Sequence, residues 1–487
     1  MALPDDSNPI EWVNYLGRMH DGDLQSLREY DALYQGTAPL HYIHPEVLRE
    51  VEDRIQAVSL GWPMLAVDPL EERLDVLGFA YPEEDEPDPD AAPDELVSAV
   101  GDKNLQRVWQ DNDLDEESQM GHLDALVMKR AYVTVGTNDS GDTDSPLVTV
   151  ESPLEMFALV DPRTRKVRAA LRRWTEEYDP LTQMPQTYAT LYLPNMTAWF
   201  DRGPQGWRET HRDPHQLGEP LVSPLTNRTR LANRYGASEL TDPLISLTHA
   251  ANKVASDMML AAERHALPLR ALFGLGPDDF VKDGRRQSAT QVIMGHLMAI
   301  PAEDGTKIRA HEFSASQLSN FHATLSQLAK HAAGLIGIDP SVLGMSAGDN
   351  PASADALRAR EVRLVKKAER RQKAFGGGWE RAMRLVQRLQ EGDWDPQARR
   401  LETIWRDAAT PTRAQAADAV VKLLTAKAIT RRQSRQDLGY TPMQIRRMEA
   451  EDRAEAALDP LGVFGLERGQ QEPVALPSGE PSTEPVA

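Results

Sequence analysis

The sequence predicts an α+β fold in which helices predominate. Residues 242–266 and 314–336 place apolar side chains at the 3.6-residue spacing of an amphipathic helix, and residues 353–392 place them seven apart. Short runs of β-branched and aromatic residues, such as Tyr132–Val135 and Leu147–Val150, predict strands in the first half of the chain. Strands of this kind can form an α+β domain beside the long helices.

Composition places the chain among ordinary globular proteins. Its 487 residues allow roughly two to four domains of about 100–200 residues, and 40% of them are hydrophobic and 26% charged. The absence of cysteine excludes disulfides, thiolate catalysis and cysteine-ligated metal sites, and it suits a reducing cytosol. The first residues lack the basic segment and apolar core of a signal peptide, and no apolar run approaches the ~20 residues of a membrane helix. We therefore expect a soluble intracellular protein with no membrane partner.

The net charge of −21 argues against a protein that binds nucleic acid tightly, because lysine and arginine supply the affinity for phosphates. An acidic chain is nevertheless compatible with DNA that slides past without being held, and acidity for solubility alone is an equal alternative.

The charge is unevenly distributed along the chain. Pro82–Glu95 is acidic, rich in proline and free of basic residues, which predicts a mobile surface loop. Pro351–Phe375 instead carries eight basic and three acidic residues, which predicts a solvated helix face, ion pairs with an acidic neighbour, or a surface near DNA.

The elements of residues 1–240 mix helix and strand signals. Apolar residues across Ile10–Tyr34 predict one or two amphipathic helices. Besides the two runs named above, Lys166–Trp174 and Thr187–Tyr192 also predict strands. The following helix begins at Asp242 and Pro243, which suit the N-cap and the first helical position.

Residues 267–313 lose helical periodicity and contain several turn signals around short apolar runs, so we expect a small β-containing insertion. The apolar stripes on the helices to either side are candidates for contacts between subunits, since one subunit can only partly bury them. The candidate contact residues are Leu247, Met258, Leu325 and Leu328.

A loop separates the helix that ends near Ile336 from the last long helix. Pro340 cannot donate a backbone hydrogen bond and disfavours a helical conformation at Asp339, whereas Asn350 and Pro351 suit a new helix start. Three glycines, Gly376–Gly378, predict a kink or break in the long helix that follows, since each costs about 1 kcal/mol relative to alanine. Two shorter helices are expected near residues 412–426 and 442–457, and residues 458–487 are expected to be disordered.

The sequence shows no active site. It contains no phosphate-binding P-loop motif, no H-E-x-x-H, no G-x-S-x-G and no EF-hand. His211 and His215 could share a helical face, but Pro214 interrupts that segment and no third metal ligand is obvious. We therefore expect no catalytic residue, no metal and no cofactor, and hence no enzyme.

Three segments resemble the portal proteins of tailed bacteriophages, specifically the siphophage type. They are Leu65–Phe79, Trp109–Val135 and Pro340–Leu389, and the resemblance covers about residues 10–457. It implies a portal-type subunit with wing, stem, clip and crown regions that assembles into a ring. The implied regions are a wing at 1–240, stem helices at 241–266 and 314–336, a clip at 267–313, a tunnel loop at 337–352, a further wing helix at 353–392 and a crown at 393–457.

The same resemblance implies roles for particular residues. The tunnel loop would line the channel through Asp339, Ser341, Met345, Ser346, Asp349 and Asn350. A basic helix would lie near DNA through Arg358, Arg363, Lys366, Lys367 and Arg370. The clip would meet its partners through Asp278, Asp279, Phe280, Lys282, Arg285 and Arg286.

The resemblance implies that a ring, dodecameric in this family, sits at one capsid vertex of the virion after synthesis in the host cytoplasm. Double-stranded DNA would enter and leave through it. Its expected partners are the terminase large subunit, a head-tail adaptor, and the major capsid and scaffolding proteins. A cytosolic helical adaptor, or a divergent nucleic-acid enzyme with an unrecognised active site, is the alternative.

Overall fold

The computed structural model describes most of the chain and divides it into two compact units, Met1–Ala409 and Thr410–Ala487. The described residues are 3–39, 58–81, 102–138, 144–176, 185–266, 270–273, 281–282, 285–286, 297–300, 309–312, 318–343, 354–409, 413–440 and 442–458. The acidic segment 82–95 and the end of the chain after residue 458 lie outside them. Each unit is described by itself.

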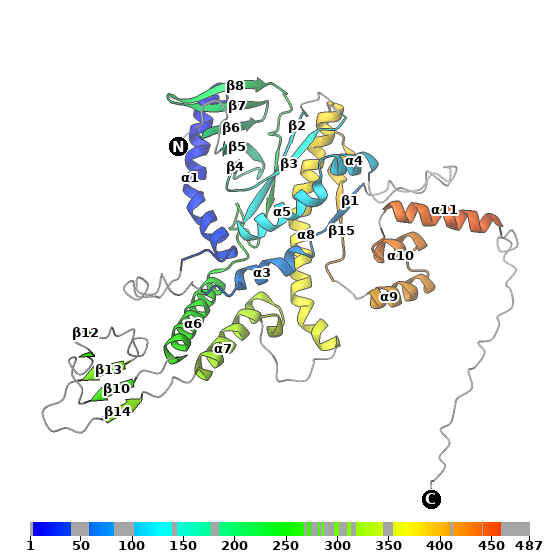
Figure 1. Cartoon of the computed structure of the whole chain (residues 1–487). Helices are drawn as coiled ribbons and strands as arrows, with labels where there is room; N and C mark the ends of the chain where they lie inside the picture. Colours follow the sequence, from blue (N-terminus) through cyan, green and yellow to red (C-terminus); the bar gives the residue numbers. More distant parts are fainter. Residues whose placement is uncertain are drawn as a thin grey trace, which may run out of the picture. The chain divides into compact units, whose positions relative to one another are not determined.

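A five-stranded antiparallel sheet forms one layer of the first unit, in the order β4-β5-β6-β7-β8. Its strands are Met156–Val160, Val167–Glu176, Gln186–Leu193, Met196–Gly203 and Gly206–Asp213. The helix α1 (Pro9–Tyr34) lies along this sheet (Figure 1). Its Trp12, Val13 and Leu16 are buried against Leu171, Leu191 and Phe200 of the strands. One continuous helix therefore occupies the segment for which one or two were predicted.

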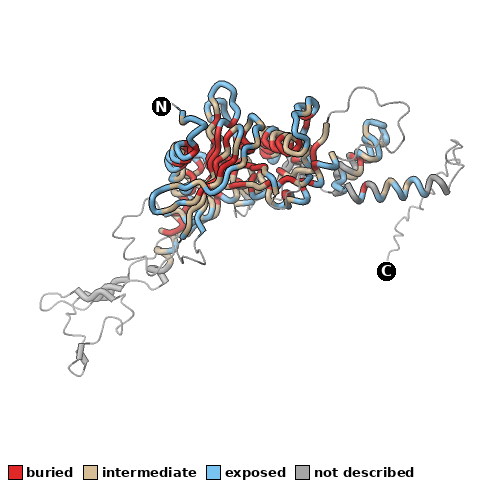
Figure 2. The backbone as a smooth tube through the Cα atoms, turned by 90° about the horizontal axis from the view of Figure 1, so that it is seen from above, coloured by how far each residue is buried: buried red, intermediate tan, exposed pale blue. Residues whose placement is uncertain are grey.

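A second sheet, in the order β3-β2-β9, carries the larger core. Its strands are Leu147–Glu151, Arg130–Gly136 and Val222–Thr226. The helices packed around it are α3 (Trp62–Glu71), α4 (Lys103–Asp111), α5 (Leu114–Val127) and α8 (Ala354–Glu391). The short strands β1 (Val76–Ala80) and β15 (Glu402–Trp405) pair beside α8. Buried residues gather in this sheet-bearing part of the unit (Figure 2).

The four predicted strand segments are confirmed, and four further strands of these two sheets were not predicted. The missed strands are β4, β7, β8 and β9. The strand β8 has the sequence GWRETHRD, whose side chains are largely exposed, so it has no apolar alternation to reveal it. His211 lies in this strand with its ring centroid 5.1 Å from that of Trp199. The idea that His211 and His215 share a helical face is therefore wrong.

The predicted order of helix, β-containing insertion and helix is present. The helices are α6 (Asp242–Ala266) and α7 (Ser319–Ile336), and they pack against each other. Between them lie β10 (Arg270–Phe273), β11 (Val281–Lys282), β12 (Arg285–Arg286), β13 (Leu297–Ile300) and β14 (Arg309–Glu312). The strand β10 pairs with both β13 and β14, and β11 pairs with β12. A short 3-10 helix, η2 (Pro340–Leu343), follows α7.

A kink or a break was predicted at Gly376–Gly378, and the break is wrong because α8 is a single helix of 38 residues. Two of the three glycines lie where other backbone or side-chain atoms approach closely. A Cβ atom at Gly378 would come within 2.7 Å of Leu225 Cδ2 and 2.9 Å of the Pro224 oxygen, and one at Gly376 within 3.2 Å of Trp405 Nε1. The glycines therefore let α8 lie against β9 and β15, and that packing keeps the helix intact despite their low helix propensity.

The described residues of the second unit form helices. They are α9 (Arg413–Thr425), α10 (Arg431–Asp437) and α11 (Pro442–Leu458). The first and last were predicted, and α10 was not. Ion pairs join Arg435 to Asp452 and Arg432 to Glu449, which link α10 to α11. Residues 393–409, which the resemblance implied to be the start of the crown, belong to the first unit, where β15 pairs with β1.

Candidate functional site

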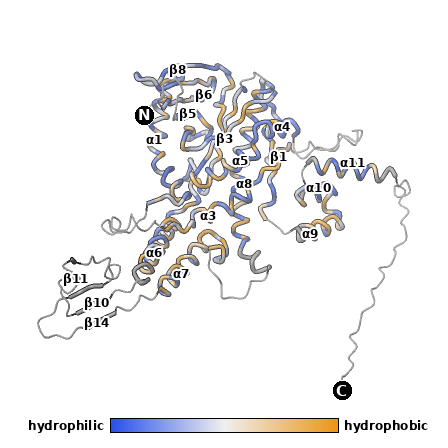
Figure 3. Tube along the Cα trace, viewed as in Figure 1, coloured by the Kyte–Doolittle hydropathy of each residue, from blue (hydrophilic) through white to orange (hydrophobic). Residues whose placement is uncertain are grey.

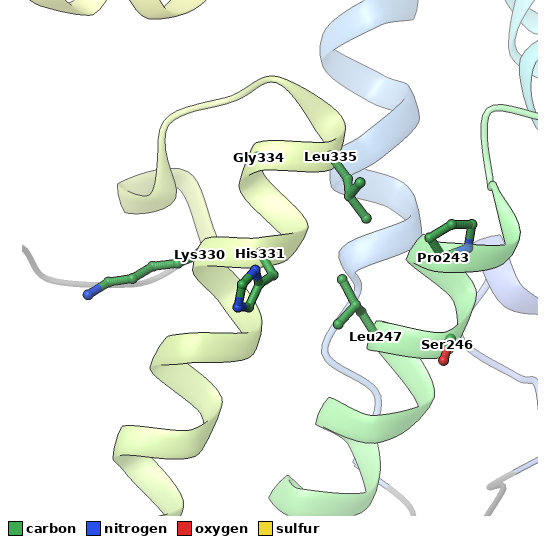
Figure 4. A pocket seen from close by; sticks show the side chains of 7 residues that line it. All are labelled: Pro243, Ser246, Leu247, Lys330, His331, Gly334 and Leu335. Carbon is green, nitrogen blue, oxygen red and sulfur yellow. The ribbon is translucent and has the colours of Figure 1, made fainter.

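The pair of helices α6 and α7 presents an open pocket of about 580 Å³. Both helices alternate between hydrophobic and hydrophilic segments along their length (Figure 3). The pocket is lined by Pro243, Ser246, Leu247, Lys330, His331, Gly334 and Leu335. Leu247 and Leu335 point into the space between the helices, while the Lys330 ammonium points away from α6 (Figure 4). The result is an apolar recess at the solvent-facing junction of two helices.

The four predicted contact residues lie on these two helices and are all half-buried. Leu247, Leu325 and Leu328 contact the core of their own unit, so part of each apolar stripe is satisfied within the subunit. Other apolar side chains on the two helices remain exposed to solvent. Leu335 is 43% exposed and Met259 is 50% exposed. The structure therefore brings the predicted leucines together along the helix pair and leaves further apolar surface uncovered beside them.

The loop after α7 is described only at its start. Gly337 ends the helix with φ of +92°, and its backbone N–H donates to the Ala333 oxygen at 2.8 Å. Asp339 follows, and Ser341 lies in η2, although its side chain is outside the described part. Met345, Ser346, Asp349 and Asn350 also lie outside the described residues.

The basic part of α8 divides into paired and exposed side chains. Lys366 pairs with Glu369 one turn away, and Arg363 donates to the Gly334 oxygen of α7 at 2.9 Å. Arg370 is exposed, whereas the side chain of Arg358 is outside the described part. Lys367 is bound to an acidic partner from another element, so the ion-pair interpretation holds for this residue.

That acidic partner is Glu239, which sequence reasoning did not find. Its side chain is 4% exposed. Glu239 Oε2 lies 2.6 Å from Lys367 Nζ, and Oε1 lies 2.6 Å from an Arg371 guanidinium nitrogen and accepts from the Asn227 amide at 3.0 Å. Burial alone would raise the pKa of Glu239, but Lys367 and Arg371 outweigh it and hold the pKa below its ordinary value.

Glu239 connects the start of α6 to the middle of α8. It lies three residues before Asp242, the first residue of α6, and its backbone N–H donates to the Leu126 oxygen at the end of α5 at 2.9 Å. The only sequence signal was the excess of positive charge on α8, which required acids from elsewhere in the chain. A carboxylate 128 positions away from Lys367 cannot be assigned to that role without the fold.

The predicted clip residues lie within or beside the strand pair β11–β12. Lys282 is opposite Arg285, and Arg286 is opposite Val281, in antiparallel register. The side chains of these three basic residues are outside the described part, as are Asp278, Asp279 and Phe280 altogether. The structure thus brings Lys282, Arg285 and Arg286 together in the backbone, and their contacts with partners remain predictions.

No group of three or more potential ligands gathers into a metal site within the described residues. Among the same residues, no helix is both long and apolar enough to cross a membrane.

Comparison with known proteins assigns the family. Residues 15–457 match the family model described as "Phage portal protein, SPP1 Gp6-like". The portal protein of Mycobacterium phage D29 is 38% identical over 449 residues, which cover 91% of this chain and 88% of the relative. The portal protein of Mycobacterium phage L5 is 37% identical over 453 residues, which cover 90% and 88%.

Solved structures of low sequence identity also match. A chain in the neck of an empty GTA particle, computed with C6 symmetry, aligns with a TM-score of 0.44 and 12% identity, over 82% of this chain and 95% of that chain. One in the neck of a native GTA particle, computed with C12 symmetry, gives 0.41 and 13%, over 82% and 94%. On the family match and the two mycobacteriophage relatives, the chain belongs to the SPP1 Gp6-like family of phage portal proteins.

Proposed function

We propose that this chain is the subunit of a homo-oligomeric portal ring, expected to be dodecameric, set at one capsid vertex of the virion. DNA is packaged through its central channel and later leaves by the same route. The observation that carries the proposal is the family match over residues 15–457. The role is structural, and the ring serves as a conduit and as a docking site rather than as an enzyme.

The helix pair α6–α7 supports this proposal as the part of the subunit that meets its neighbours. Both helices leave apolar side chains exposed after packing against each other, notably Met259 and Leu335. An adjacent subunit would cover this surface and gain the hydrophobic free energy of burying it. The β-containing insertion between the helices would form the clip that meets the terminase large subunit and later a head-tail adaptor. The wing would meet the major capsid and scaffolding proteins.

The charge distribution supports a channel in which DNA is handled without being held. The chain is strongly acidic overall, and the segment from Ile338 to Asn350 contains no lysine or arginine. A surface of this kind makes few contacts with phosphates, so DNA can slide along it. The exposed basic residues of α8, including Arg363 and Arg370, would lie close to DNA without gripping it.

Replacing Leu328 with aspartate is expected to weaken ring assembly strongly, because it places an unpaired charge in an apolar contact. Leu247→Asp is expected to act in the same way from α6. Ala323→Asp is the matched control, since Ala323 is exposed on the same helix. Light scattering during size-exclusion chromatography gives the fraction of ring, and circular dichroism confirms that each variant is folded. Full ring yield from both folded leucine variants would contradict this interface.

A further inference from the structure

The loop between β9 and α6 is fixed at both ends. At its start, the buried amide side chain of Asn227 donates to the Ala237 oxygen at 2.8 Å, and its backbone N–H donates to the Lys129 oxygen at 3.0 Å. At its end, Gly236 has φ of +86°, and a Cβ atom there would come within 2.1 Å of the same Lys129 oxygen. The Tyr235 oxygen accepts from Arg130 at 3.3 Å. Residues 228–234, here called the basic loop, therefore project from a rigid base.

The basic loop exposes charge and an apolar side chain together. Arg228, Arg230 and Arg234 are exposed, and no acidic residue lies between them. Leu231 is 95% exposed. Within the described residues none of the three arginines forms an ion pair, while the Asn233 N–H donates to the Arg230 oxygen at 3.1 Å inside the loop. An ordered loop that holds a leucine in solvent is preorganised for burial against another surface.

The positive region continues onto α8. Arg381 and Arg384 lie one turn apart on that helix, and neither has an ion pair in the described part of the chain. Burial lowers the pKa of Arg381 most, the nearby cation Arg384 lowers it further, Glu219 raises it, and Arg228 lowers it slightly. Positive charge is therefore concentrated here and only partly offset by Glu219 and Glu380, in a chain whose net charge is −21.

The outer face of α5 has the complementary character. Asp113, Glu116 and Met120 are exposed and follow the spacing of one helical face, here called the acidic face. Met120 is 48% exposed. Gly121 marks the face that packs on the sheet, because a Cβ atom there would meet Val150 Cγ1 at 2.5 Å. Asp113 and Glu116 form no ion pair with any described residue.

The two surfaces lie at opposite ends of the same structural layer. The base of the basic loop is bonded to Lys129, two residues after α5 ends, whereas the acidic face begins at the other end of α5. A helix of 14 residues is about 21 Å long. The strand β2 gives the same placement of the loop, because Arg130, its first residue, pairs with Thr226, which lies beside the basic loop. Asp113 and Glu116 therefore lie roughly 20 Å along α5 from the base of the loop, and the loop arginines form no ion pair with them in the described part of the chain.

We propose that the basic loop of one subunit docks on the acidic face of the next subunit of the ring. Leu231 packs against Met120, and the arginines pair with Asp113 and Glu116. Two different surfaces of a subunit make a head-to-tail contact, which is the kind that can close into a ring. Leu231 favours a protein partner over DNA, since a phosphate backbone offers nothing to bury it. The pocket between α6 and α7 is a poorer acceptor for arginines because its lining contains no carboxylate.

The experiment is a charge swap that uses the whole chain, and it rests on the ring proposed above. Arg230→Glu with Arg234→Glu is expected to lower the yield of rings at least about tenfold at low salt, and Asp113→Arg with Glu116→Arg is expected to do the same. All four substitutions in one chain should restore the rings. Arg163→Glu with Arg165→Glu, in the exposed β4–β5 turn, makes the same change in charge elsewhere and should leave the yield unchanged. Mass photometry counts rings and free subunits.

The outcomes separate this contact from the ring itself. If the wild-type chain forms no rings, both the proposed function and this contact are wrong. If the wild type forms rings, two results would show that only the contact is wrong. One is that either charge reversal, in the basic loop or on the acidic face, leaves the ring yield unchanged. The other is that the variant with all four substitutions fails to regain the ring yield. Rings that form normally from Arg230→Glu/Arg234→Glu but release DNA more readily would assign the loop to DNA and overturn the proposal. Leu231→Ser, which keeps the charges, should reduce the yield as well, and no reduction would also count against the contact.

Discussion

Replacing Glu239 with alanine is expected to lower the free energy of unfolding of the first unit by about 3–5 kcal/mol. The substitution leaves Lys367 and Arg371 without the carboxylate that neutralises them, and the Arg371 side chain is only 8% exposed. All nine tryptophans lie in the first unit, so their fluorescence during urea unfolding follows this unit alone. Glu369→Ala is the matched control, because it removes a carboxylate from an exposed ion pair on α8, the helix that carries Lys367 and Arg371, and should change stability little.

The same substitution predicts an acid-dependent difference. The pKa of Glu239 is lowered in the folded protein, so its contribution is present above its unfolded pKa of about 4.3 and is lost as the pH falls through the folded value. The wild type and Glu239→Gln should therefore differ in stability at pH 7, and the difference should shrink as the pH falls below about 4.3 and through the folded pKa. A difference that stays constant from pH 7 to pH 3 would show that the charge of Glu239 does not stabilise the fold.

Replacing both Met345 and Ser346 with lysine is expected to stall DNA packaging while rings still form. The segment proposed as the tunnel loop carries no basic residue between Gly337 and Asn350, and if it lines the DNA path the new ammonium groups would bind the passing phosphates. Met345→Gln with Ser346→Gln is the control, since it adds length without charge. The measurement is the rate of DNA uptake into heads, and raising the salt concentration should partly restore it. Unchanged uptake from confirmed rings of the lysine variant would remove this loop from the DNA path.

Periodicity was sufficient to locate the long helices, because α6, α7 and α8 each bury one continuous face. Periodicity failed where contacts between distant segments determine the local conformation. Gly376 and Gly378 signal a break in any isolated helix, yet here they allow close packing against β15 and β9. The strand β8 was not predicted because both its faces carry exposed charges at the edge of a sheet.

The positions of the candidate contact leucines on helices were predicted from the sequence, whereas the ion pairs that connect distant segments were not. The leucines of α6 and α7 were found from their spacing, since burial along a helix leaves a repeating pattern. The pairing of Glu239 with Lys367 and Arg371 could not be found this way, because an ion pair between distant segments leaves no pattern in either. The basic loop was missed for a similar reason. Its significance depends on the rigid base made by Asn227 and Gly236, which only the fold reveals.

The central claim is that this chain forms a ring around a channel, and electron microscopy of the purified full-length protein tests it most directly. Class averages of particles viewed end-on should show a closed ring with a central hole, and mass photometry of the same sample should give a single multiple of the subunit mass of 54.2 kDa. Monomers, or compact particles without a hole, at micromolar protein concentration in low and moderate salt would contradict the account.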